Sequence, residues 1–444
     1  MLGWKVLKEH HDYKIHLPQL SEDEEKLILE IEDKFKETTR EKDVSNPEEG
    51  AAMIRSLVLD FTYKKGIDLD LNQMEYLPKI AYCHIYGFGI LDDLLKDREI
   101  EEISVIGINS PVYVFLRNKG WQKVNANFTT HKQLLETINK LAKNSGRRIT
   151  LQNPRLDAML ANGARMHASL PPLSRGEITI RKFRDEPFSP KDLLDKQTIP
   201  IDALAILSCV MHSDSSLIIA GNTASGKTTT LNALFSFVPS TERIIITEET
   251  PEINIPHKHK VNLISNKEMG VQLRDLVYDS LRMRPDRMIV GEIRNKEECE
   301  ALFEVLLAGQ ARGSYGTMHG KSVRETISRI RNFGIDELDL RSIDTIVVQR
   351  RMLIYDKKAR RNMEVRRVVE ISDLDGSFLL FNGEKYIYKK PVRLFEALSE
   401  KLGLNQKELE DEIEFRKTLI KKSPYQFDLF FKNVQKQLYG NQDV

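Results

Sequence analysis

The stretch GNTASGKTTT, residues 221–230, restricts the possible folds of this chain more than any other segment. Gly221, Gly226, Lys227 and Thr228 match the pattern G-x-x-x-x-G-K-[ST], whose glycines let backbone N–H groups turn inward around phosphate oxygens. In this pattern the lysine reaches the β- and γ-phosphates, the threonine hydroxyl ligates Mg²⁺, and the next helix presents its positive end. Because the loop works only between a strand and a helix, it predicts an α/β domain that takes ATP and Mg²⁺.

The segments around this loop have the required order. Residues 216–220 are apolar, as in a short buried strand, and a helical stripe of apolar side chains follows the loop. From residue 200 onward, predicted strands and helices alternate, which is typical of a mainly parallel sheet covered by helices. We expect the nucleotide to contact the whole loop, namely Gly221, Asn222, Thr223, Ala224, Ser225, Gly226, Lys227, Thr228 and Thr229.

The length of 444 residues predicts two or three domains. The helical spacing of Leu27, Ile31 and Phe35 indicates an N-terminal helical module. Alternating apolar residues further on indicate an α+β domain, and a segment with three prolines marks a linker. We therefore expect a helical module at 1–75, an α+β domain at 76–185, a linker at 186–200, and the phosphate-binding domain with a C-terminal helical extension at 201–444.

The balance of charged residues argues against a bulk attraction to nucleic acid, because 67 Lys and Arg face 66 Asp and Glu. Three separated cysteines, Cys83, Cys209 and Cys299, form no C-x-x-C pair, so we expect neither a disulfide framework nor a zinc module. No apolar run approaches the roughly 18 residues that would span a bilayer. These features fit a cytoplasmic protein that would lie on a membrane surface if it works at a membrane.

Two segments near the C-terminus leave alternatives open. Residues 344–372 read as two strands joined by a polar turn, and their many Arg and Lys residues fit either a solvated hairpin edge, which we favour, or nucleic-acid binding. Phe427, Phe430 and Phe431 lie on one side of a predicted helix. We expect this aromatic stripe to pack on its own domain, with a docking face as the alternative.

Hydrolysis of a bound triphosphate needs a group that orients or deprotonates water. The apolar strand in MIVGEIR ends in Gly291-Glu292 without an Asp, so Glu292 is the leading candidate for polarising the attacking water; the alternative is a glutamate merely exposed to solvent. Arg294 could hold Glu292 or an element of a neighbouring chain, or be a surface residue. His319, in GSYGTMHG, follows another apolar strand, where it could sense the γ-phosphate or be structural.

A second acidic group, Glu248, Glu249 and Glu252 in IIITEETPE, follows a further predicted strand. Carboxylates at the end of a strand can hold Mg²⁺ through its water ligands, which makes Glu249 a candidate beside Thr228. Because acidic loops are common, this pattern alone is a weak indication.

Four segments, GNTASGKTTT, IIITEETPE, LRMRPDRMIVGEIR and GTMHG, occur in an order that closely resembles the secretion ATPase superfamily. That superfamily powers type II and type IV secretion, type IV pili and the archaeal motility filament. In it these segments correspond to the Walker A loop, the Asp box, the Walker B region and the His box. The resemblance covers roughly residues 85–372 and implies a RecA-like ATPase domain.

The resemblance also implies roles for single residues. Arg165 in NGARMHA and Arg181 in TIRKF match arginines of the N-terminal domain that complete the nucleotide site in the family. Phosphate-binding, metal-binding or catalytic roles fall to Lys227, Thr228, Glu248, Glu249, Glu292 and His319.

This sequence departs from the family pattern in three ways. Glu248-Glu249 stands where the Asp box usually reads Glu-Asp, so the longer second side chain moves the charge that would position the metal. Three scattered cysteines cannot build the four-cysteine zinc module of many bacterial members, and the His box has the style of the archaeal branch. In that branch, pilus and archaellum motors are close relatives. The resemblance implies a homohexamer on the inner face of the cytoplasmic membrane, with a polytopic platform protein and accessory filament-assembly proteins as partners.

The main interpretation is therefore a hexameric motor that hydrolyses ATP to extrude or turn a filament. One alternative is a nucleic-acid translocase on the same core, against which the near-neutral charge argues, and no specific nucleic acid is expected as a partner. Another alternative is a non-catalytic scaffold gated by nucleotide. A small-molecule kinase is least favoured, because no separate acceptor site is visible.

Overall fold

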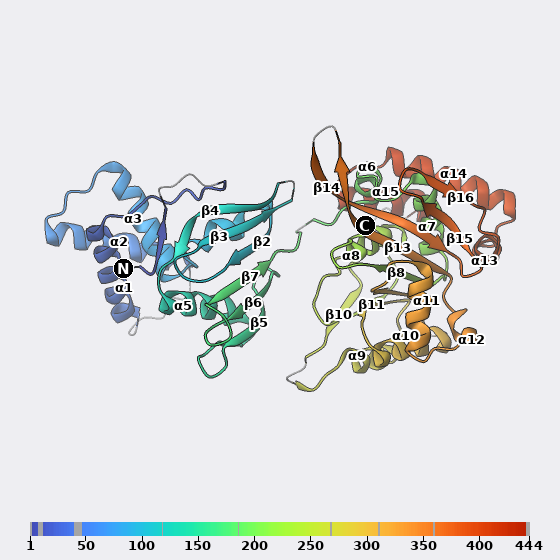
Figure 1. Cartoon of the computed structure of the whole chain (residues 1–444), viewed down its shortest axis with the longest axis horizontal. Coiled ribbons are helices and arrows are strands. Elements are labelled where there is room, and N and C mark those ends of the chain that lie inside the picture. The colour runs from blue at the N-terminus through green and yellow to red at the C-terminus, as the bar shows by residue number, and fades with distance from the viewer. Residues whose placement is uncertain are drawn as a thin grey trace. The chain divides into compact units, whose positions relative to one another are not determined.

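The computed structural model divides the chain into two compact units, Met1–Arg184 and Asp185–Val444. Figure 1 labels the elements of both units along the chain. The predicted boundary residue Asp185 lies outside the described part of the chain. The structure describes residues 2–7, 12–39, 47–117, 119–184, 186–266, 269–309, 311–357 and 360–440.

Within the described residues, the first unit contains a seven-stranded antiparallel sheet in the order β1-β4-β3-β2-β7-β6-β5. One hydrophobic core joins this sheet to the helices, and Ile31, Ile80 and Ile103 are fully buried in it. The helices of the first unit therefore pack as part of the same body as its sheet. The elements are β1 (Trp4–Val6), α1 (Glu22–Thr39), α2 (Pro47–Lys65), α3 (Leu71–Ile85), α4 (Leu91–Lys96), β2 (Ile100–Val105), β3 (Pro111–Leu116), β4 (Gly120–Phe128), α5 (His131–Ala142), η1 (Lys143–Ser145), β5 (Arg155–Met159), β6 (Arg165–Ser169) and β7 (Glu177–Arg181).

Both tryptophans of the chain belong to the first unit. Trp4 on β1 is buried in the core, whereas Trp121 on β4 is 49% exposed. The ring of Trp121 packs edge-on against Phe115 of β3, with 5.4 Å between the ring centroids. The two indoles thus have different surroundings within one unit.

In the second unit, the described strands form a nine-stranded sheet in the order β10-β9-β11-β12-β8-β13-β14-β15-β16. The strands from β10 to β13 are parallel, and those from β13 to β16 are antiparallel. Strand β12 lies between β8, which leads into the glycine-rich loop, and β11, which carries Glu292. This order confirms the predicted α/β fold with a mainly parallel, RecA-like sheet.

The predicted linker region contains a short helix, and further helices and strands complete the second unit. The elements are α6 (Pro190–Asp195), α7 (Ile201–His212), β8 (Leu217–Gly221), α8 (Lys227–Leu234), η2 (Phe235–Phe237), β9 (Ile244–Glu248), β10 (Lys260–Ile264), α9 (Leu273–Leu281), β11 (Arg287–Ile293), α10 (Lys296–Ala308), β12 (Gly313–Met318), α11 (Val323–Asn332), α12 (Glu337–Leu340), β13 (Thr345–Asp356), β14 (Arg361–Ser372), β15 (Ser377–Phe381), β16 (Tyr386–Tyr388), α13 (Val392–Leu402), α14 (Gln406–Lys422) and α15 (Phe427–Tyr439).

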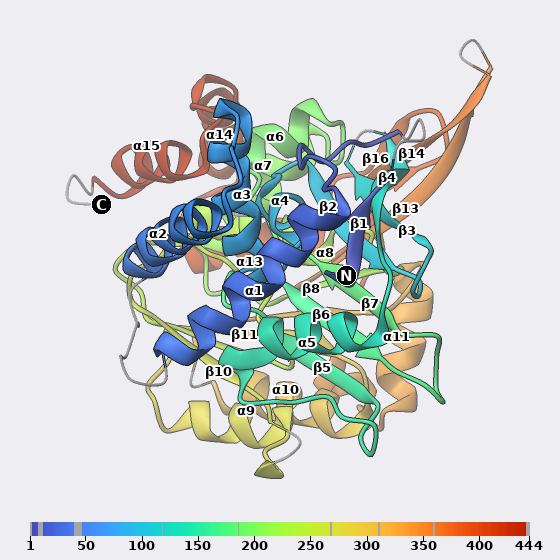
Figure 2. The ribbon, with the colours of Figure 1, turned by 90° about the vertical axis from the view of Figure 1, so that its left-hand side faces the viewer.

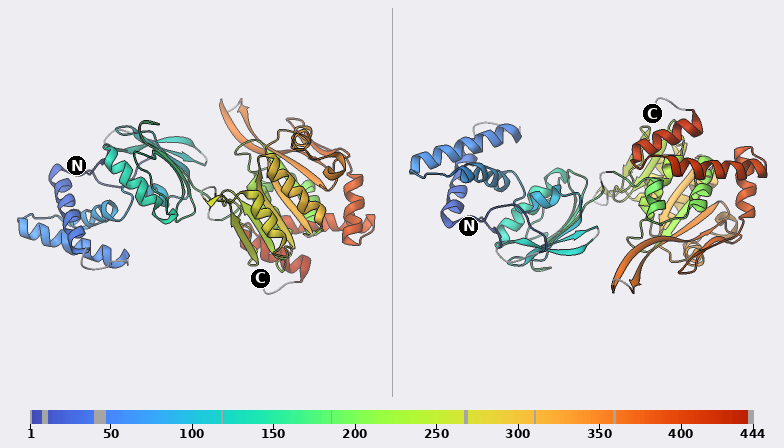
Figure 3. Two further views of the ribbon diagram at one scale, coloured as in Figure 1. Left: turned by 90° about the horizontal axis from the view of Figure 1, so that it is seen from below. Right: turned by 90° about the horizontal axis from the view of Figure 1, so that it is seen from above.

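Helices cover both faces of this sheet, as Figure 3 shows for the second unit. Successive side chains of a strand point to opposite faces, so Leu217 and Ile219 of β8 join the core beneath α7, α8 and α13 to α15. Ile218 and Ala220 join the opposite core with α9, α10 and α11. A strand buried on both faces needs apolar residues at every position, which explains the continuous apolar run before the loop.

The C-terminal helix α15 packs against its own unit, as predicted. Phe427, Phe430, Phe431 and Val434 are buried, and the ring of Phe430 lies edge-on to Phe237 at 5.9 Å between centroids. None of the helices in the described part of the chain combines the length and apolar character needed to cross a membrane.

A buried polar cluster ties α7 to α14. Arg416 is 1% exposed, and its guanidinium donates hydrogen bonds to the Ser208 carbonyl at 2.9 Å and to Nδ1 of His212 at 2.7 Å. Since arginine can only donate, Nδ1 of His212 must be unprotonated. Burial, together with the charges of Arg416 and Arg287, lowers the pKa of His212 to about 4.

We predict that this histidine makes the second unit less stable in acid. The unfolded chain takes up a proton near pH 6.5 and the folded chain only near pH 4, so stability falls as the pH drops through this window, by up to roughly 3 kcal/mol. In His212→Gln, whose amide oxygen can still accept from Arg416, the loss between pH 7 and pH 4.5 should be smaller. Hydrogen–deuterium exchange of α7 and α14 at both pH values measures this loss of stability. Equal losses in both proteins would show that His212 does not cause the acid sensitivity.

Candidate nucleotide site

The glycine-rich loop leaves β8 at Gly221 and enters α8 at Lys227. Ala224 and Gly226 have positive φ values of 59° and 92°. These backbone angles turn successive N–H groups toward one side, as in an anion-binding nest. Gly226 caps α8 without any side-chain hydrogen bond, so the N–H groups of the first turn have no capping oxygen. The local geometry is that of a cradle for phosphate oxygens.

Gly221 must be glycine because β13 passes too close for a side chain. A Cβ atom at this position would lie 2.1 Å from the carbonyl oxygen of Gln349 and 2.5 Å from Oγ of Ser225. The side chain of Gln349 is 1% exposed; its Nε2 donates to the Ser225 carbonyl at 2.8 Å, and its Oε1 accepts from Thr230 at 2.6 Å. One buried amide thus fastens the loop to the helix that follows it.

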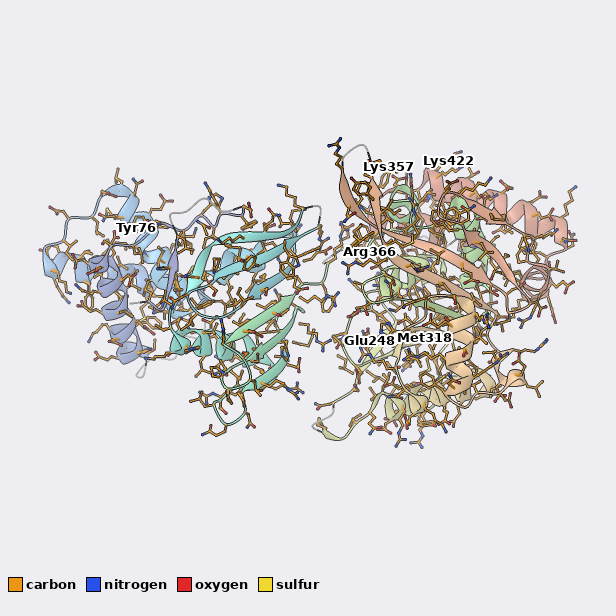
Figure 4. The ribbon with its side chains drawn as sticks, in the orientation of Figure 1. Tyr76, Glu248, Met318, Lys357, Arg366 and Lys422 are labelled. Carbon is orange, nitrogen blue, oxygen red and sulfur yellow. The ribbon has the colours of Figure 1, made fainter. Side chains whose placement is uncertain are left out.

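Hydrogen bonds from β14 and from the side chain of Asn222 also fix the glycine-rich loop. Nε of Arg366 donates to the carbonyl of Ala224 at 3.0 Å, and Figure 4 labels Arg366 on this strand. The side chain of Asn222 pairs with the backbone of Arg351, accepting from its N–H at 2.9 Å and donating to its carbonyl at 3.2 Å. Gln349 and Arg366 were not predicted as site residues, because their segment reads as a solvated hairpin. A buried glutamine at the end of the apolar run TIVVQ was the available signal.

The carboxylate of Glu292 lies at the centre of three basic side chains. Its oxygens are 3.8 Å from Nζ of Lys227, 3.2 Å from Nε2 of His319 and 2.6 Å from Nη2 of Arg294. Burial raises the pKa of Glu292, but the hydrogen bond and charge of Arg294, with Lys227 and His319, outweigh burial and lower the pKa below its ordinary value. Glu292 is therefore an ionised hydrogen-bond acceptor at neutral pH.

Strand β11 is longer than its apolar run. It continues through Gly291 and Glu292 to Ile293, and its pairing with β12 shifts in register between Val290 and Ile293. The strand was expected to end in Gly291-Glu292, and the irregular pairing carries it one residue further, to Ile293. A Cβ at Gly291 would lie 2.9 Å from Cγ of Glu248, so the neighbouring strand approaches closely here.

Three glutamates, one at the end of β9 and two in the loop that follows it, have different surroundings. Glu248 is 2% exposed, and its Oε1 accepts from the backbone N–H groups of Glu252 and Ile253 at 2.8 and 2.9 Å. Burial raises the pKa of Glu248 to about 7, although these hydrogen bonds oppose the rise. Glu249 pairs with Arg294, and Oε2 of Glu252 accepts from the Thr228 hydroxyl at 3.3 Å. Glu248 thus fixes the backbone of the segment that follows β9. Glu249 and Glu252 contact Arg294 and Thr228, which lie beside the phosphate cradle.

His319 directly follows β12, as predicted. Its Nδ1 lies 3.3 Å from the carbonyl oxygen of Gly221. Since Nε2 faces Glu292, the ring connects the start of the phosphate loop to the acidic side chain. The structure therefore brings together the predicted residues Lys227, Thr228, Glu249, Glu292 and His319 within the second unit.

The two remaining predicted residues, Arg165 and Arg181, belong to the first unit. They begin β6 and end β7, where they are direct partners across the antiparallel pair, and both are exposed. Like charges directly opposite each other on a sheet repel, and Glu102 of β2, which lies opposite Arg181 on its other side, offsets part of this positive charge.

The residues present fit a triphosphate with Mg²⁺. The cradle offers backbone N–H groups, and Lys227 is held within it, 8% exposed. Among the described residues, no group of three or more His, Cys, Asp or Glu could hold a metal by itself. Mg²⁺ keeps several waters and binds through few protein oxygens plus phosphate. The Thr228 hydroxyl would be such an oxygen, and Glu249 stays the predicted water-mediated contact.

The sheet order and the loop define a P-loop domain of the RecA-like class. The chain belongs to the family described as type II/IV secretion system protein, whose family model matches residues 88–383. This match confirms the resemblance recognised from the four motifs.

The chain is also similar to the following relatives and to one solved structure. Two uncharacterized proteins of Methanocaldococcus jannaschii are 36% and 32% identical over 257 and 307 residues, covering 55% and 67% of this chain. The chain covers 35% and 54% of their lengths, so it spans about a third to a half of these relatives. The type IV secretion system protein VirB11 of Bartonella henselae is 30% identical over 246 residues, 46% of this chain and 68% of that protein. The crystal structure of the pilus retraction motor PilT with bound ADP has a TM-score of 0.48 at 17% identity, covering 75% of this chain and 92% of that one.

We predict that Gln349 is needed to keep the phosphate loop in shape. Gln349→Leu leaves the buried Ser225 carbonyl and Thr230 hydroxyl unpaired, which costs about 1–3 kcal/mol. Affinity for a fluorescent ATP analogue should therefore fall about tenfold or more. Thr230→Val removes only one of the two hydrogen bonds and should have a smaller effect. Unchanged affinity in a folded Gln349→Leu protein would show that the loop holds its shape without this amide.

Proposed function

We propose that this protein is an ATP-hydrolysing motor that works as a ring of six copies and powers the assembly, secretion or rotation of a type IV pilus-like filament. Membership of the secretion family supports the ATPase activity. The observation that carries the proposal is the ionised Glu292 carboxylate beside Lys227 of the phosphate loop and His319.

In this proposal Lys227 leaves Glu292 to bind the phosphates, and Glu292 then accepts a hydrogen bond from the attacking water. The water oxygen bonds to the γ-phosphorus, the bond from that phosphorus to the bridging oxygen breaks, and ADP and phosphate result. A carboxylate with a lowered pKa is a weak base, so Glu292 orients the water, and the water's proton finally passes to the phosphate. Mg²⁺, when bound, neutralises charge on the phosphate oxygens.

Arg294 supports a switching role beside Glu292. Its guanidinium binds Glu292 and Glu249 together, so it restrains both carboxylates in one arrangement. If Glu249 turns to a metal-bound water, Glu292 becomes the remaining partner of Arg294, so the pKa of Glu292 stays low, because Arg294 is the largest influence that lowers it. Metal binding at Glu249 would then leave Glu292 fixed by Arg294 as an ionised acceptor for the attacking water.

The wider setting of the motor is also part of the proposal. We place the ring at the inner face of the cytoplasmic membrane, with a polytopic membrane platform protein and accessory filament-assembly proteins as partners. VirB11 is named as a type IV secretion system protein, and PilT is described as a pilus retraction motor. These descriptions support a secretion or pilus system over other uses of a P-loop ATPase.

We predict that Glu292→Gln abolishes hydrolysis while ATP still binds. The amide cannot act as the charged acceptor, so phosphate release should fall about 100-fold or more, while affinity for a fluorescent ATP analogue stays within a few fold. The matched control is Glu300→Gln, which changes a glutamate that pairs with Lys296 on α10. Phosphate release near the unmutated rate would exclude Glu292 from catalysis and favour a non-catalytic scaffold.

We predict that Arg165, with Arg181, supplies positive charge to a nucleotide site. If it serves a neighbouring copy, mixing Arg165→Ala chains with unmutated chains should reduce phosphate release by more than the fraction of mutant chains. Arg155→Ala, an exposed arginine on β5, is the matched control. A strictly linear decline with the mutant fraction would mean that Arg165 does not act between copies.

A further inference from the structure

The β13–β14 ribbon extends beyond the rest of its sheet, as Figures 1 and 2 show. Strand β13 pairs with β8 only over residues 345–349, and β14 pairs with β15 only over residues 370–372. The two strands continue to pair with each other as far as Asp356 and Arg361. We call residues 350–356 and 361–366 the outer ribbon. Within the described part of the chain, neither of its edges has another strand as a neighbour.

The outer ribbon exposes apolar side chains on both faces. Leu353 and Tyr355 share one face and are 70% and 58% exposed. On the opposite face, Ile354 and Met363 are direct partners across the ribbon and are 37% and 38% exposed. An isolated two-stranded ribbon is marginally stable in water. An exposed apolar ribbon with free edges is therefore expected to bind another surface.

The charge of the ribbon indicates what kind of surface it binds. The outer ribbon and the turn that joins its strands, residues 350–366, have seven Arg and Lys against two Asp and Glu, a net charge of +5. Because the whole chain carries +1, the remainder of the chain carries −4. Outside its own ribbon, a second copy of this chain is therefore acidic on balance, opposite in sign to the ribbon.

A membrane fits the ribbon less well than a protein does. Backbone N–H and C=O groups along the free edges would stay unpaired in lipid, which is costly, whereas a protein surface can pair them by adding a strand. Lys357, at the outer end of β13, is exposed and labelled in Figure 4. The outermost described position of the ribbon is thus charged.

The inner end of the outer ribbon is joined to the phosphate loop. Glu364 pairs with both Arg351 and Arg366, at 2.5 and 2.9 Å. Arg366 donates to the Ala224 carbonyl, and the backbone of Arg351 pairs with the side chain of Asn222. A displacement of the ribbon would therefore move the loop that is expected to hold the phosphates.

We propose that the outer ribbon docks on a second copy of this chain and links the nucleotide site of one copy to its neighbour. The inference rests on the proposed function, since it supplies a contact for the proposed ring. It assigns the basic hairpin to binding between copies, where sequence analysis left a solvated edge or nucleic-acid binding.

The first test removes the apolar contacts of the ribbon. The double variant Leu353→Thr, Tyr355→Thr keeps residues that favour strands, and in sedimentation velocity with a nonhydrolysable ATP analogue it should shift from oligomer to monomer. The separated copies should still bind the analogue within a few fold of the unmutated affinity. Leu338→Ser changes a side chain that is 79% exposed on α12 and should leave assembly unchanged. Unchanged assembly of the double variant would overturn the inference.

The second test identifies the occupant directly. A photo-crosslinker on Tyr355→Cys can be attached selectively, because Cys83, Cys209 and Cys299 are all buried. Crosslinks between two copies of the chain are expected. The absence of such crosslinks in an assembled oligomer would overturn the inference. Binding to phosphatidylglycerol vesicles that the double variant loses while still assembling would reassign the ribbon to the membrane.

The outcomes also separate this inference from the proposed ATPase activity. If the unmutated chain stays monomeric with the analogue, the inference and the ring fail together. Loss of phosphate release in Glu292→Gln would still support hydrolysis in that case. If the ring forms without the ribbon, the motor proposal stands and only the docking surface is wrong.

Discussion

The close approach of β13 to the start of the glycine-rich loop is the constraint on which the rest of the site depends. Gly221 has no room for a Cβ because the Gln349 carbonyl occupies that space. The same close approach puts the Gln349 amide within hydrogen-bonding reach of Ser225 and Thr230. The loop is therefore shaped by a strand that lies more than a hundred residues further along the chain. The phosphate-loop motif in the sequence identifies Gly221, and it gives no indication of Gln349, which packs against it.

Opposite pKa shifts separate two glutamates at neighbouring strand ends. Burial raises the pKa of Glu248 to about 7, with no cation among the described residues to oppose it, and its hydrogen bonds fix the backbone of the following loop. Glu292 is also partly buried, but Arg294, Lys227 and His319 surround it and lower its pKa. The difference comes from the neighbours, since both residues are glutamates on adjacent parallel strands. One side chain organises the backbone, and the other presents a negative charge to the site.

Much of the second unit could be predicted because its parallel strands are buried on both faces and read as continuous apolar runs. The loop motif, the acid after the Walker B strand and the histidine after β12 follow from short local patterns. Gln349 and Arg366 could not be found this way, because their partners around the phosphate loop lie 119 to 142 residues away and only the sheet order brings them together. The roles of Arg165 and Arg181 rest on family resemblance, since nothing local distinguishes them from other exposed arginines. The continuation of β11 to Ile293 depends on a register shift against β12, which no single-strand pattern encodes.

The placement of Trp4 and Trp121 in the first unit has a practical consequence. Intrinsic indole fluorescence comes only from that unit, and the phosphate-loop unit contributes none. An emission change when nucleotide is added would therefore report an event transmitted across the chain to the other unit. A solvent quencher such as iodide would reach Trp121 and not Trp4, so the two signals could be resolved without any label.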